Sequence, residues 1–112
     1  MNVVALRGTL SSPPRALDLP SGDRLVAHEV TVATDDGPDE SVNVAWFDPP
    51  ASTRPLDAGD EVVVVGRVRR RFFRTRTGHT ASRTEVVADR VVPATQRARV
   101  AELLARAAAA LE

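Results

Sequence analysis

Arginine and phenylalanine are concentrated in one short stretch of the chain, GRVRRRFFRTR, from Gly66 to Arg76. This stretch continues a run of valines, and in an extended strand every second side chain lies on the same face. One face therefore carries Arg67, Arg69, Arg71 and Phe73. Guanidinium groups bind phosphates and an exposed ring stacks on a base, so this face suits a single-stranded nucleic acid.

Other arginines could extend this surface. Arg74, Arg76 and Arg83 lie at or near the turn that follows the stretch, and Arg7 lies on the outward face of an N-terminal strand. We include all four as candidate nucleic-acid contacts.

The adjacent rings of Trp46 and Phe47 are also candidates. Neighbouring side chains of a strand point to opposite faces, so one ring faces the core and the other faces out. Alternation with Val42 and Val44 puts Trp46 inside and Phe47 outside, whereas a register shift of one residue reverses the assignment. Both rings therefore remain candidates for base stacking.

Composition argues against catalysis. The chain has no cysteine and no tyrosine, its two histidines are far apart, and no glycine-rich phosphate loop precedes a helix. We expect no catalytic residue, no metal site and no cofactor.

The formal net charge is zero, so binding to a polyanion depends on how the 15 arginines are distributed. No apolar run could span a membrane and the N-terminus lacks signal-peptide features, so we expect a cytoplasmic, nucleoid-associated protein.

Alternating apolar residues predict an all-β fold. The expected strands cover residues 3–10, 25–34, 42–47, 61–73 and 82–92, and the last two form a long β-hairpin around Thr77-Gly78-His79. Strand composition stops at Pro93, and Thr95 is expected to cap an α-helix that runs to about Leu111. Its apolar stripe comprises Val100, Leu103, Leu104, Ala107 and Leu111. We expect one barrel or sandwich domain over residues 1–92 and a C-terminal helix over 93–112.

The opening MNVVALRGTLSSPPRALDLPSG resembles that of bacterial single-stranded DNA-binding proteins. The matching residues are Met1, Asn2, Gly8, Leu10, Pro14, Arg15, Pro20, Ser21 and Gly22. Val32-Ala33-Thr34, the valine strand after Gly59-Asp60, and Thr84 to Asp89 resemble later strands of the family in the same order. The resemblance covers roughly residues 1 to 92.

The resemblance implies a five-stranded OB-fold barrel, homo-oligomers (dimers or tetramers), and sequence-tolerant binding of single-stranded DNA without catalysis, in replication, repair or recombination. One stacking position of the family matches Phe73, and another matches Trp46 or Phe47. Two further positions fall near Pro38 and Ser41, where this chain has no aromatic residue.

The chain also departs from the family pattern. An acidic segment, Asp35 to Glu40, lies where the family often has a basic loop, and a predicted helix replaces the family's disordered linker and acidic tip. Partner enzymes that dock on an acidic tail are therefore not expected.

Two valines of the fourth strand, Val63 and Val65, point outward and need a cover. A second copy of the chain or the C-terminal helix could provide it, and we predict a dimer or a higher oligomer. The alternative function is a diverged oligomeric protein-interaction module with little nucleic-acid binding. The sequence does not separate DNA from RNA.

Overall fold

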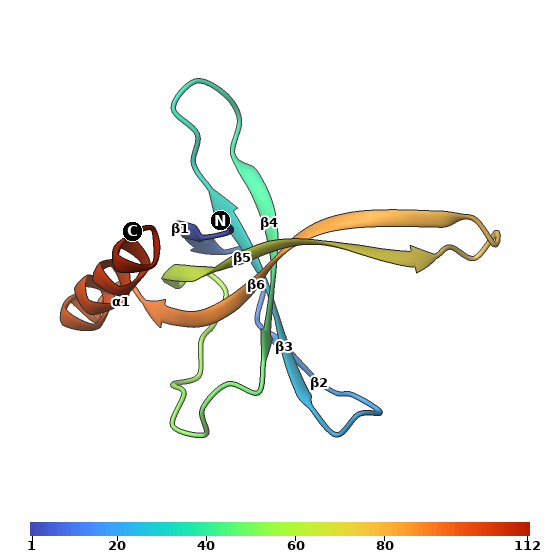
Figure 1. Cartoon of the computed structure of the whole chain (residues 1–112), viewed down its shortest axis with the longest axis horizontal. Coiled ribbons are helices and arrows are strands. Elements are labelled where there is room, and N and C mark those ends of the chain that lie inside the picture. The colour runs from blue at the N-terminus through green and yellow to red at the C-terminus, as the bar shows by residue number, and fades with distance from the viewer.

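The computed structural model describes residues 1–112 and is built mainly of strands. Its elements are β1 (Val4–Leu10), β2 (Arg15–Asp18), β3 (Arg24–Val32), β4 (Glu40–Phe47), β5 (Glu61–Arg74), β6 (Thr80–Pro93) and α1 (Arg97–Ala110). Figure 1 shows α1 on one side of the barrel and the β5–β6 hairpin extending from the other side.

Five strands form a closed ring. They follow the order β1-β5-β6-β4-β3, and the ring closes because β1 pairs with β3 as well as with β5. Only β4 and β6 run parallel; the other pairs are antiparallel. This arrangement confirms the predicted five-stranded OB-fold barrel with a long hairpin and a C-terminal helix.

A sixth strand, β2, was not predicted. Prolines and Gly22 flank it, so the sequence suggested turns between residues 13 and 22. All four residues of β2 are exposed and therefore show no alternation, but they pair with β3 from Arg24 to Ala27. This strand lies outside the barrel ring, on the free edge of β3.

The barrel core follows the predicted alternation. It comprises Leu10, Val30, Val44, Trp46, Val62, Val64, Val86, Ala88 and Val91. The opposite face of β5 contributes Val63 and Val65 to a second cluster, which α1 covers with Leu103 and Ala107. The two outward valines are thus buried within one chain.

The helix differs from the prediction at two points. Its N-cap is Gln96, with no side-chain cap, instead of Thr95, because the chain first makes a turn in which the Gln96 N–H donates to the Pro93 carbonyl. The apolar stripe is also narrower than predicted, since Leu104 and Leu111 are exposed. With 14 residues, α1 is too short to cross a membrane.

His28 on β3 is an ionisable side chain inside the barrel. It is 5% exposed, its ring centroid lies 6.4 Å from that of Trp46, and its Nδ1 has no hydrogen-bond partner. Burial lowers the pKa of His28, and a hydrogen bond with the Val26 backbone offsets part of this effect. The folded protein therefore favours the neutral ring.

Protonation of His28 is expected to make stability depend on pH. Because its folded-state pKa is lower than the unfolded value of about 6.5, stability is full above that pH and falls as the pH drops below it. The loss is at most about 1.4 kcal/mol per pH unit. Urea unfolding between about pH 5 and pH 7.5 should show a smaller dependence in His28→Leu than in the wild type. His79→Gln, in an exposed turn, is the matched control, and parallel losses in wild type and His28→Leu would contradict the assignment.

Candidate nucleic-acid interface

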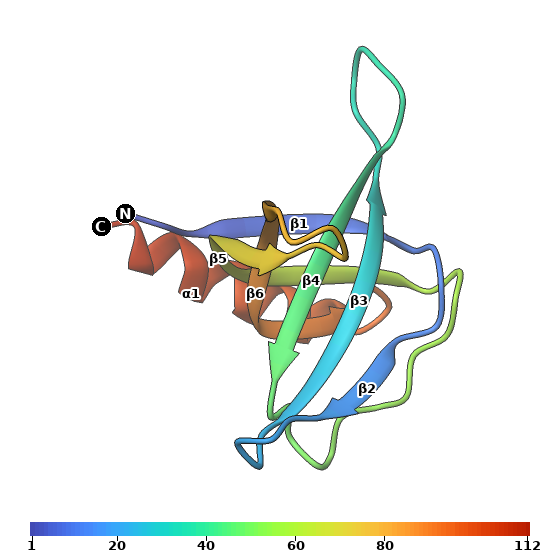
Figure 2. The ribbon, with the colours of Figure 1, turned by 90° about the vertical axis from the view of Figure 1, so that its right-hand side faces the viewer.

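The β5–β6 hairpin leaves the barrel as a two-stranded arm. At the point of departure β6 carries one extra residue, because Val65 pairs with Arg90 whereas Gly66 pairs with Ala88. A bulge of this kind bends the ladder. Residue 66 must be glycine here, since a Cβ would overlap the Val87 carbonyl. Figure 2 shows the arm projecting toward the viewer, in front of the barrel strands.

One face of the arm carries the predicted arginines. The β5 residues Arg67, Arg69, Arg71 and Phe73 lie opposite Val87, Glu85, Arg83 and Ala81 of β6. Because directly opposed residues share a face, these eight residues form one surface, which we call the arm face. The pairing also places Arg83 opposite Arg71, midway along the arm rather than at its tip.

Glu85 is a buried carboxylate on the arm face. Its side chain is 8% exposed, and its Oε1 lies 3.3 Å from Arg71 Nε and 3.8 Å from Arg69 Nη2. It therefore attracts both guanidinium groups and offsets one of their two positive charges, but its Oε1 accepts no hydrogen bond from either. Sequence reasoning did not identify this residue, because its position beside the arginines depends on the pairing of β5 with β6.

Two phenylalanine rings, one on the arm face and one on β4 beside it, each have an arginine guanidinium over them. The Arg69 guanidinium lies 5.3 Å from the centroid of the Phe47 ring, and that of Arg83 lies 5.8 Å from Phe73. Both distances are within the range of cation–π contacts. A flat guanidinium on a ring provides a second planar surface on which a base can stack.

The two adjacent aromatic residues of β4 separate as the alternation indicated. Trp46 is 5% exposed and packs in the barrel core, so it presents almost no surface to a base. Phe47 is half-buried on the outside, and Arg69 joins it to the arm face. Of the two, Phe47 is the ring that a ligand can reach.

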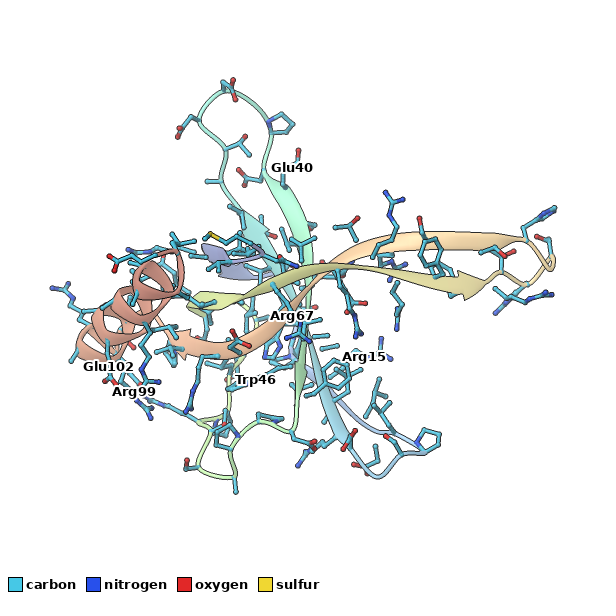
Figure 3. The ribbon with its side chains drawn as sticks, viewed as in Figure 1. Arg15, Glu40, Trp46, Arg67, Arg99 and Glu102 are labelled. Atoms are coloured by element: carbon cyan, nitrogen blue, oxygen red, sulfur yellow. The ribbon has the colours of Figure 1, made fainter.

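A row of side chains connects the arm to the outer strands. Arg67 pairs with Val87, Val87 with Ala45, Ala45 with Ala27, and Ala27 with Arg15 of β2. The two arginines therefore stand at the ends of a row of smaller apolar residues. Figure 3 shows Arg67 near the middle of the molecule and Arg15 to its right, with α1 at the left. Arg15 was not among the predicted contacts, because β2 itself was not predicted.

The other predicted contacts lie apart from the two arginine–phenylalanine pairs. Arg7 forms an ion pair with Glu61 at 2.6 Å instead of joining the arm face. Arg74 ends β5 and Arg76 lies in the arm's terminal turn. The acidic loop between β3 and β4 projects in a different direction from the arm (Figure 1).

Comparison with known proteins identifies the family of this chain. None of the curated proteins matches the chain. The model of the single-strand binding protein family matches residues 1–94, which include the whole barrel and the arm but not α1. Since the match covers most of the chain, this protein belongs to the single-strand binding protein family.

Proposed function

We propose that the chain binds single-stranded DNA along the arm face and the neighbouring surface of β4. The observation that carries this proposal is the pair of arginine-covered rings, Arg69 on Phe47 and Arg83 on Phe73, on one surface of a family member. Phosphates contact the strand arginines and bases stack on the rings or on the guanidinium planes. Arg15, at the far end of the row, offers a further phosphate contact.

The buried carboxylate moderates this binding. A phosphate that approaches Arg69 or Arg71 competes with Glu85, which already pairs with both. Binding is therefore weaker than three free arginines would give, and it depends strongly on salt. Stacking and phosphate contacts do not read base edges, so sequence preference is small.

The biological role follows from this activity. The proposal places a non-enzymatic, cytoplasmic, nucleoid-associated protein in DNA replication, repair or recombination. Residues 1–92 form the nucleic-acid-binding unit and residues 93–112 the appended helix. A dimer or tetramer stays a prediction, although α1 now covers the two valines that motivated it. Light scattering at micromolar concentration decides the oligomeric state.

Titration with fluorescently labelled oligo(dT) at several salt concentrations tests the function. We expect saturable binding at low salt, which is measured as a rise in the fluorescence anisotropy of the labelled oligo(dT). Stacking contributes about 1–3 kcal/mol per base, so Phe73→Ala should raise Kd roughly fivefold to 150-fold. The matched control is Phe72→Ala, which removes a 66% exposed ring from the opposite face of the same strand.

Three other outcomes of these titrations would change the proposed function, the binding surface or the ligand. No binding at low salt contradicts the proposed function and favours the protein-interaction alternative. A larger loss in Phe72→Ala than in Phe73→Ala moves the binding surface to the other side of the arm. Tighter binding of oligo(U) than of oligo(dT) makes RNA the ligand.

A further inference from the structure

A cavity of about 170 Å³ opens on another part of the molecule. Its walls are the end of β4, the β4–β5 connection, the end of β6 and one face of α1. Figure 3 shows Trp46, Arg99 and Glu102 around this region, on the α1 side of the chain. No residue of the arm face lines it.

The cavity is strongly positive. Four arginines line it, Arg54, Arg90, Arg99 and Arg106, against a single carboxylate, Glu102. That carboxylate pairs with Arg106 at 3.2 Å, and Arg99 donates to the Gln96 side chain at 3.1 Å. Arg54 and Arg90 have no carboxylate within ion-pair distance. In a chain with zero net charge, this excess of positive groups favours an anionic ligand.

Apolar side chains complete the wall. Trp46, Leu56 and Leu103 lie beside the arginines. Cavities of about 150 Å³ accommodate a benzene-sized ring, so this one has room for a phosphate group and part of the adjoining sugar or base. Arginine binds phosphate through two parallel N–H donors, whereas Trp46 and Leu103 are almost completely buried and offer little surface to a base.

We propose that this arginine-lined cavity binds a nucleotide through its phosphate group. The ligand is either a free nucleotide or a nucleotide of a DNA strand that continues past the arm; both present the same chemistry. The cavity depends on α1, which begins beyond the residues that match the family. The site therefore combines residues of the matched barrel with residues of α1.

The only tryptophan of the chain reports on this cavity. Trp46 lines it and is absent from the arm face, so a ligand there should change its emission. The probes are thymidine diphosphate, unlabelled oligo(dT) and a poly-glutamate peptide, each at low salt, with calorimetry in parallel. The test variant is Arg54→Ala/Arg99→Ala. Arg97→Ala is the matched control, because Arg97 lies on the same helix but outside this cavity.

We expect a saturable response to at least one nucleotide probe in the wild type. The affinity should fall at least about tenfold in Arg54→Ala/Arg99→Ala, because the variant removes two donors of charge-assisted hydrogen bonds to phosphate. It should stay unchanged in Arg97→Ala. The affinity for thymidine diphosphate should also stay unchanged in Arg69→Ala/Arg71→Ala, whereas that variant weakens oligo(dT) binding through the arm face. A response to thymidine diphosphate identifies a free nucleotide, and a response to oligo(dT) alone identifies the strand.

The proposal is overturned if neither thymidine diphosphate nor oligo(dT) changes the emission or gives a heat of binding in the wild type. It is also overturned if the response persists in Arg54→Ala/Arg99→Ala, or if the response to thymidine diphosphate disappears in Arg69→Ala/Arg71→Ala. A response to poly-glutamate alone also overturns it, in favour of an acidic protein partner. Failure of the proposed DNA-binding function is recognised separately, by anisotropy of labelled oligo(dT).

Discussion

Replacing Arg67, Arg69 and Arg71 together with alanine is expected to weaken oligo(dT) binding roughly a hundredfold at about 50 mM salt. Each phosphate contact on a single strand contributes about 0.7 to the slope of log K against log salt. Because Glu85 neutralises part of this cluster, the variant should lose about two to three contacts and lower the slope by about 1.4–2.1. Anisotropy titrations across a range of salt concentrations measure both quantities.

Removing a negative charge from the arm face, instead of positive charges, provides the control. Glu85→Gln keeps the shape of the side chain, but it removes the competing negative charge. We expect its affinity to rise roughly fivefold to tenfold at about 50 mM salt, with a slope steeper by about 0.7. The gain should shrink as salt increases, because counterion release is its source.

These two variants separate the possible roles of the arginine cluster. If the triple variant keeps the wild-type slope, phosphates do not bind the arm face. If Glu85→Gln weakens binding instead, the carboxylate acts mainly by holding Arg69 and Arg71 in position, and its competition with phosphate is the smaller effect.

Strand alternation was sufficient to predict the arm face on β5. Period-two alternation continues unbroken through Gly66, because the extra residue of the bulge lies in β6 and not in β5. Arg67 to Phe73 therefore keep the face that the sequence assigned to them. For Trp46 and Phe47 the same alternation favoured Phe47 as the exposed ring, but a register shift of one residue would have reversed that assignment.

Residues that depend on pairing between strands were not predictable in this way. Glu85 lies beside Arg69 only because β6 shifts its register at the bulge, and no local pattern encodes that shift. Arg15 joins the surface through a short, fully exposed strand without apolar alternation. The arginine-lined cavity combines two stretches far apart in the sequence, residues 46–56 and 90–106, so it exists only once α1 packs on the barrel.

The contact between α1 and the barrel leads to the second large expected effect. Leu103 is 7% exposed and packs against Val63, Val65 and Val92. Leu103→Asp removes this apolar contact and would place a charge in the cluster, so we expect a loss of at least about 3 kcal/mol in the free energy of unfolding. Urea denaturation measures the loss.

The matched control is the neighbouring leucine. Leu104 is 42% exposed and lies about 100° around the helix from Leu103, so Leu104→Asp should change stability by no more than about 0.5 kcal/mol. Leu103→Asp should also self-associate more than the wild type in sedimentation velocity, because a detached helix exposes the three valines to solvent. Equal unfolding midpoints for the two aspartate variants would show that α1 contributes little to the fold. Loss of stability without added self-association would mean that the valine patch alone does not drive one copy onto another, and the predicted oligomer would then need a different surface.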